Sequence, residues 1–117
     1  MTKVRKGADC GNSPKNTLVQ ELTIAMACAN TNRIRDLVSN DVYWLAVGRK
    51  PVQGIDGFCK ALTRYGPVSE IAINHVLSHG RSGAIDGTVF VGGKRRAFCH
   101  MYEFVNAKGA KVQSMTT

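Results

Sequence analysis

The sequence predicts an α+β domain, in which helices from the first half of the chain pack on one face of an antiparallel sheet. One observation predicts this class, and a second predicts that the class describes a single domain. Before Pro67, apolar side chains recur mainly at three- and four-residue steps, which is the helical period, whereas after Pro67 the period changes to two. The chain has 117 residues, which is enough for one domain with a core of its own.

The first helix is expected to begin at Pro14, because Ser13 is a suitable N-cap and proline at the first helical position loses no hydrogen bond. Its apolar face would consist of Leu18, Leu22, Ala25, Met26 and Ala29. Asn30, Thr31 and Asn32 interrupt this pattern. A short second helix should follow and end near residue 40, with Ile34, Leu37 and Val38 on its buried side.

Residues 41–47, DVYWLAV, are rich in β-branched and aromatic side chains and predict a strand. A third helix should follow, because Ile55, Phe58, Cys59 and Leu62 have the i, i+3, i+4, i+7 spacing of one helical face. Gly66 and Pro67 would end that helix.

The second half of the chain predicts four antiparallel strands, at about residues 68–79, 84–91, 94–105 and 110–117. Gly92 and Gly93 are typical of the tight hairpin between the second and third of them. On the first, alternation places Ile71, Ile73, His75 and Leu77 on one side. Long strands coil and Gly87 favours a bend, so the sheet should curve and leave a hollow suited to a small molecule.

The composition indicates which classes of partner and which cellular location to expect. Residues 1–12 are expected to be a flexible basic tail and residues 13–117 a single domain. The net charge of +8 is dispersed, and neither an aromatic platform nor a reading helix accompanies it, so no specific nucleic acid is expected. No apolar run approaches the roughly 20 residues of a membrane span, and no secretory signal is present, which predicts a cytoplasmic protein that binds no membrane.

The four cysteines, Cys10, Cys28, Cys59 and Cys99, are too far apart in sequence for the short spacings of a metal site. They are expected to be free thiols, and no metal is expected. The sequence also contains no glycine-rich phosphate loop, no H-E-x-x-H string and no Ser-His-Asp order. We therefore expect no cofactor.

Three strings, NDVYWLAVG, PVQGIDGFCKAL and FCHMYEFVNAKGAKVQSMTT, carry a resemblance to a known family. Together with the order of elements they resemble the NTF2-like superfamily, and within it the SnoaL-like and ketosteroid-isomerase-like proteins and small stand-alone bacterial members. The resemblance implies a cystatin-like cone, with a curved antiparallel sheet wrapped around three N-terminal helices, and a homodimer. It does not fix a function, because this scaffold serves isomerases, cyclases, dehydratases and binding modules. The last strand is short for the family, which leaves its pairing open.

The catalytic positions of a ketosteroid isomerase are mostly vacant in this sequence. The resemblance places the carboxylate base three residues before Gly48, where the chain has Leu45. The first helix has no Tyr to complete an oxyanion hole. The remaining position aligns near His100. Isomerase activity of that type is therefore not expected, and whether the protein is an enzyme stays open.

Strand alternation at residues 94–105 separates two sets of side chains. Phe98, His100, Tyr102 and Phe104 share one face, while Cys99, Met101 and Glu103 share the other. If the first face is concave, it lines the hollow. The expected ligand pocket consists of Tyr43, Leu45, Phe98, His100, Tyr102 and Phe104. Trp44, which has the opposite parity to Leu45, is expected to serve core packing or an interface, and His75 and His79 are expected to be structural or surface residues.

Three functional readings remain open at this point. In the first, the hollow binds a small, mostly apolar organic ligand. In the second, the protein is a SnoaL-like enzyme of isomerase, cyclase or dehydratase type, in which His100 paired with Asp86 acts as acid or base on a carbonyl compound. In the third, it is a dimeric interaction module without a ligand.

Overall fold

The computed structural model describes residues 2–6, 13–65 and 67–117, and the predicted helices and strands follow one another in the predicted order, with two further short strands, β1 and β3. Its three helices are α1 (Pro14–Ala27), α2 (Thr31–Leu37) and α3 (Ile55–Tyr65). Its strands are β1 (Lys3–Arg5), β2 (Val38–Leu45), β3 (Val52–Gln53), β4 (Glu70–His79), β5 (Ser82–Val91), β6 (Lys94–Phe104) and β7 (Val112–Thr116). The predicted α+β class is therefore confirmed.

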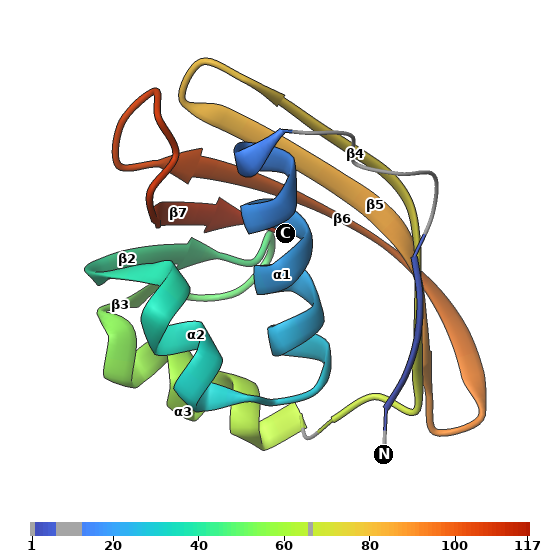
Figure 1. The fold of residues 1–117 in the computed structure, drawn as a ribbon. Coiled ribbons are helices and arrows are strands. Elements are labelled where there is room, and N and C mark those ends of the chain that lie inside the picture. Colours follow the sequence, from blue (N-terminus) through green and yellow to red (C-terminus); the bar gives the residue numbers. More distant parts are fainter. Residues whose placement is uncertain (1, 7–12, 66) are drawn as a thin grey trace.

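The strands form one seven-stranded sheet in the order β1-β4-β5-β6-β7-β2-β3. Figure 1 shows this sheet curving around α1, with the helices on its concave side. The strands from β4 to β7 are antiparallel as expected, whereas β1 pairs with β4 and β2 with β7 in parallel. Because the helices cover one side only, the sheet has one buried face and one face that lacks such a cover.

The first and the last strand of the chain, β1 and β7, add pairings that the sequence did not predict. Lys3–Arg5, inside the segment expected to be a flexible tail, form β1 and pair with β4; residues 7–12 of that segment lie outside the described residues. Inside the sheet, β7 pairs with both β6 and β2, so the short last strand has a partner on each side. Backbone hydrogen bonds to neighbouring strands therefore stabilise both of these short strands, β1 and β7.

The first helix follows its capping signals. The Ser13 side chain accepts a hydrogen bond from the backbone N–H of Asn16, and proline occupies the first turn. The helix ends at Ala27, before Ala29, which has a positive φ of 55°. Its buried residues are Leu18, Val19, Leu22, Thr23, Ala25 and Ala27. They pack on the concave face of the sheet and form the centre of the core.

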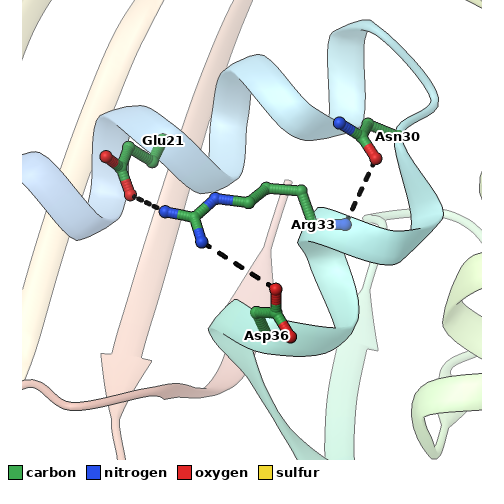
Figure 2. A network of polar contacts seen from close by, with 4 residues as sticks. All are labelled: Glu21, Asn30, Arg33 and Asp36. Atoms are coloured by element: carbon green, nitrogen blue, oxygen red, sulfur yellow. Dashed lines mark hydrogen bonds and ion pairs between the residues drawn. The ribbon is translucent and has the colours of Figure 1, made fainter.

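The second helix is tied to the first by a polar network (Figure 2). The Asn30 side chain accepts a hydrogen bond from the backbone N–H of Arg33, and the Arg33 guanidinium contacts Glu21 of α1 at 2.5 Å and Asp36 at 3.9 Å. The helix ends at Leu37, so the prediction that Val38 is helical was wrong. Val38 is fully buried and pairs with Val112 of β7, because a β-branched side chain fits a strand better than a helix end.

Loss of the α2 cap should have a measurable but modest cost. We expect Asn30→Ala to lower the free energy of unfolding by about 1 kcal/mol, because one orphan N–H of the helix loses its acceptor. Asn32→Ala is the matched control, since Asn32 is exposed in the first turn and alanine is a better helix former. Urea unfolding measures both; equal values for the two variants would refute the capping role.

A β-bulge between β4 and β5 produces a correction to the predicted faces. Ile73 pairs with Gly87, whereas His75 pairs with Asp86, so the intervening residue of β4 has no partner and the alternation reverses there. Ile71 and Ile73 are consequently buried, while His75 and Leu77 are exposed, and the prediction that all four share one side was wrong.

None of the helices in the described part of the chain is long and apolar enough to cross a membrane.

Candidate functional site

A cavity of about 590 Å³ lies between α1, α3 and the concave face of the sheet. Its apolar lining consists of Met26, Ala27, Trp44, Ala46, Val47, Val52, Ala61, Leu62, Val68, Ile71, Val89 and Phe98. Its polar lining consists of Thr23, Arg49, Lys50, Arg64, His100 and Thr117. Among the described residues, no Asp or Glu lines it. The cavity is therefore an apolar chamber with a few polar groups and only cationic charges.

His100 projects from β6 into this cavity, next to Phe98 of the same strand. Phe98 and His100 both line the cavity, and their rings lie 4.9 Å apart between centroids. Cys99, between them, is exposed on the opposite face. The alternation predicted for β6 thus holds at these residues, and Cys99 and His100 do not share a site.

A short chain of hydrogen bonds orients the His100 ring. The Trp44 Nε1–H donates to Thr117 Oγ1 at 3.3 Å, and Thr117 Oγ1 lies 3.1 Å from His100 Nδ1. If the Thr117 hydroxyl donates to Nδ1, the ring carries its hydrogen on Nε2, which is then a donor. Trp44 of β2 and Thr117, directly after β7, thereby fix the imidazole on the neighbouring strand β6.

Burial lowers the pKa of His100 to about 4. The charged imidazolium loses its hydration inside an apolar chamber, and this desolvation outweighs the other influences on the ring. The imidazole is therefore neutral at pH 7, with one donor and one acceptor nitrogen. Such a group can orient a polar atom of a ligand, but it is a weak base.

Tyr102 and Phe104 belong to the core, although the sequence assigned them to the pocket. Tyr102 is 1% exposed and its hydroxyl lies 2.8 Å from Thr23 Oγ1; Phe104 is fully buried. Thr23 donates to the backbone carbonyl of Val19, so the Tyr102 hydroxyl donates to Thr23. Burial also raises the pKa of Tyr102. Thr23, which sequence reasoning missed, is the polar group of this pair that reaches the cavity.

The faces of β2 are the reverse of the prediction. Trp44 lines the cavity and packs on Phe58 with ring centroids 5.2 Å apart, whereas Tyr43 and Leu45 do not line it. Val42 is fully buried, and alternation from Val42 leads to Trp44. The available signal in the sequence was the apolar, β-branched Val42, which has the same parity as Trp44, whereas counting back from Gly48 gave the wrong parity.

Asp86 does not pair with His100, which corrects the predicted acid–base pair. Asp86 lies opposite Cys99 in the β5–β6 register, on the face turned away from the cavity. Its carboxylate is 2.9 Å from His75 Nδ1, across the strand pair β4–β5. In the described part of the chain, no group of three or more His, Cys, Asp or Glu residues could hold a metal ion.

The lowered pKa of His100 makes stability pH dependent. The unfolded histidine has the ordinary pKa of 6.5 and the folded one about 4, so the unfolded chain binds more protons between these pH values. His100 therefore contributes full stability above about pH 6.5, and about 2–3 kcal/mol is lost as the pH falls toward 4.

Urea unfolding of the wild type and His100→Gln at pH 7.5 and pH 4.5 checks this prediction. We expect the wild type to lose about 2 kcal/mol more than the variant over this interval, because the other titrating groups are common to both. Parallel losses in the two proteins would show that His100 is not desolvated in the folded state.

Comparisons with known proteins identify the fold. A scan against protein-family models finds no match, and a search of curated proteins finds none either. A candidate ketosteroid isomerase from Kribbella flavida superimposes with a TM-score of 0.76 at 16% identity, over 87% of this chain and 74% of that one. An NTF2-like protein of unknown function from Burkholderia xenovorans gives 0.74 at 14% identity, over 91% and 84%.

An LEH-like epoxide hydrolase from Mycobacterium tuberculosis also superimposes, with a TM-score of 0.69 at 18% identity, over 87% of this chain and 79% of that one. At these identities the likeness establishes the architecture alone. The chain has the NTF2-like, cystatin-like fold that its sequence resembles.

Proposed function

We propose that this NTF2-like chain binds a small, mostly apolar organic molecule in the cavity between α1, α3 and the sheet. The observation that carries the proposal is the chamber itself, whose volume of about 590 Å³ lies within the usual range of roughly 300–1,000 Å³ for ligand sites. Twelve of its lining residues are apolar or aromatic, so burial of ligand surface would supply most of the affinity.

The polar groups inside the cavity would orient the ligand. His100 is neutral and fixed by Thr117 and Trp44, so its ring presents a set hydrogen-bonding direction. Thr23 also lines the cavity, but its hydroxyl is buried and engaged by Val19 and Tyr102, so His100 is the main orienting group. A ligand with one hydroxyl or carbonyl group within reach of His100 fits this arrangement best, because a buried polar atom without a partner would cost affinity.

Binding is favoured over acid–base catalysis by the chemistry of the lining. In this cavity, proton transfer would fall to His100, whose pKa of about 4 makes it a poor base at pH 7. Asp86, the predicted partner, lies on the other face. The enzymatic alternative would be supported by deuterium exchange next to the carbonyl of ketone ligands that is lost in His100→Ala.

A thermal-shift screen of small apolar alcohols, ketones and carboxylic acids tests the proposed function. A ligand that binds the folded state alone must raise the Tm, and the shift must grow with its concentration. We expect hits among compounds that combine an apolar body with one polar group. A screen in which no compound raises the Tm would refute ligand binding and leave the interaction module.

We also propose that the chain forms a homodimer through the sheet face turned away from the helices. A row of mostly apolar residues crosses this face from strand to strand. Leu77 pairs with Ala84 and Ala84 with Met101. Met101 and Leu45 both pair with Thr116, which lies between them. Leu77 is 66% and Met101 50% exposed in one copy. A second copy would remove this surface from water.

The charges on β6 favour a second copy as the occupant. Arg95 and Glu103 lie four residues before and after Cys99, on the same exposed face. A two-fold axis near Cys99 would bring Arg95 of one copy beside Glu103 of the other, as an isologous interface requires.

Light scattering coupled to size exclusion measures this assembly. The wild type should have the mass of a dimer and Met101→Lys that of a monomer, because a charge would be buried in the apolar row. Val91→Lys, at the β5–β6 hairpin, is the control and should stay dimeric. A monomeric wild type would refute the homodimer.

A cytoplasmic location completes the proposal. The thiols of Cys28, Cys59 and Cys99 are free, which suits a reducing compartment.

A further inference from the structure

We infer that the ligand is an amphiphilic carboxylate, with its apolar body in the cavity and its anionic head at the cavity mouth. The cavity mouth is defined here by Arg49, Lys50 and Arg64, the exposed basic residues of the lining. This inference rests on the proposed function, because it names the chemical class of the ligand for the same cavity.

The three cations line the same cavity from two separate segments of the chain. Arg49 and Lys50 lie in the loop between β2 and β3, which turns at Gly48 with a φ of 87°. Arg64 lies in the last turn of α3. The chain thus places positive charge from two segments along the exposed part of the cavity lining, where it can attract anions from solution.

Lys50 and Arg64 differ from Arg33 and Arg35 in their surroundings. Arg33 and Arg35 contact the carboxylates of Glu21 and Asp56. By contrast, no ion pair joins Lys50 or Arg64 to a carboxylate within residues 2–6, 13–65 and 67–117, and no acid from these ranges lines the cavity. An anionic ligand would supply the missing negative charge.

The interior sets the orientation of the ligand. Beyond the mouth, the wall is apolar apart from Thr23, Thr117 and the neutral His100. Burial of a carboxylate there would cost its hydration without a countercharge, whereas at the mouth the head stays hydrated beside Lys50 and Arg64. A cationic head would be repelled at the mouth, so the geometry selects an anion.

Three probes with one apolar chain and different heads test the inference: octanoate, octanol and octyltrimethylammonium. Trp44 is the only tryptophan of the sequence and lines the cavity, so its fluorescence reports binding. At low salt we expect octanoate to bind about tenfold more tightly than octanol, as two or three exposed charge pairs allow, and octyltrimethylammonium to bind most weakly. High salt should reduce the preference for octanoate.

Two double variants test whether the preference for octanoate depends on the cations at the cavity mouth. Lys50→Gln with Arg64→Gln should reduce the affinity for octanoate to that for octanol and leave octanol binding unchanged. Lys60→Gln with Lys108→Gln removes the same charge from exposed residues outside the cavity lining and should keep the preference.

The other outcomes separate a failure of the carboxylate inference from a failure of the proposed function. Equal affinity for the three probes would overturn the carboxylate inference and leave the proposed function intact. Equal loss of octanoate binding in both double variants would also overturn it, because net charge rather than the mouth would then be responsible. If none of the probes changes Trp44 fluorescence, the proposed function fails, and the inference fails with it.

Discussion

Replacement of Gly87 by alanine is expected to lower the free energy of unfolding by more than about 3 kcal/mol. A Cβ at this position would lie 2.0 Å from the backbone oxygen of Ala72 and 3.0 Å from the Phe98 ring. The nearest obstacle is backbone of the paired strand, so it cannot move aside as a side chain can. The β-bulge would have to open, and with it the curvature that shapes the cavity.

Gly57→Ala provides the matched control for this substitution. Its Cβ would meet only the Val52 side chain, at 3.2 Å, and alanine favours the helix at that position. Urea unfolding should therefore show a change within about 1 kcal/mol for Gly57→Ala. Equal stability of Gly87→Ala and Gly57→Ala would refute the close approach of the β4 backbone to Gly87 of β5.

Ala61→Phe is expected to weaken ligand binding at least about thirtyfold, which corresponds to a loss of about 2 kcal/mol of apolar contact. Ala61 is a half-buried residue of α3 that lines the cavity, so a phenyl ring can extend into the space that the ligand would fill. The ring replaces the ligand rather than disturbing the core. The folded protein should therefore keep its stability.

Ala61→Ser is the control, because it keeps the volume of the cavity nearly unchanged. Titration of both variants with octanoate, followed by Trp44 fluorescence, should show the loss in Ala61→Phe alone. Undiminished binding in Ala61→Phe, with unchanged urea unfolding, would place the ligand somewhere other than this cavity.

The sequence predicted the order of elements because the period of the apolar residues changes at Pro67, and because Ser13 and Pro14 mark a helix start. It did not predict the reversal of faces after Ile73. That reversal depends on one unpaired residue opposite Gly87, and a bulge changes no residue type that alternation would detect. The parallel pairing of Lys3–Arg5 was equally hidden, since a strand of three residues has too few positions to show a period.

The cavity could be predicted only in part. Alternation along β6 correctly turned Phe98 and His100 inward, but it could not show that Tyr102 lies behind Thr23 in the core. On β2 the residue count from Gly48 favoured Tyr43 over Trp44. That Lys50 and Arg64 line the same cavity depends on tertiary packing of a loop and a helix end, and no local pattern in the sequence contains it.

Contact quenching of Trp44 tests the central claim, that the space between α1, α3 and the sheet accepts a small molecule. Bromo-octanoate quenches indole fluorescence on contact, and Trp44 is the only indole of the chain. Quenching should saturate, be reversed by unlabelled octanoate and disappear in Ala61→Phe. Quenching that rises without saturation, equally in the wild type and Ala61→Phe, would contradict the claim.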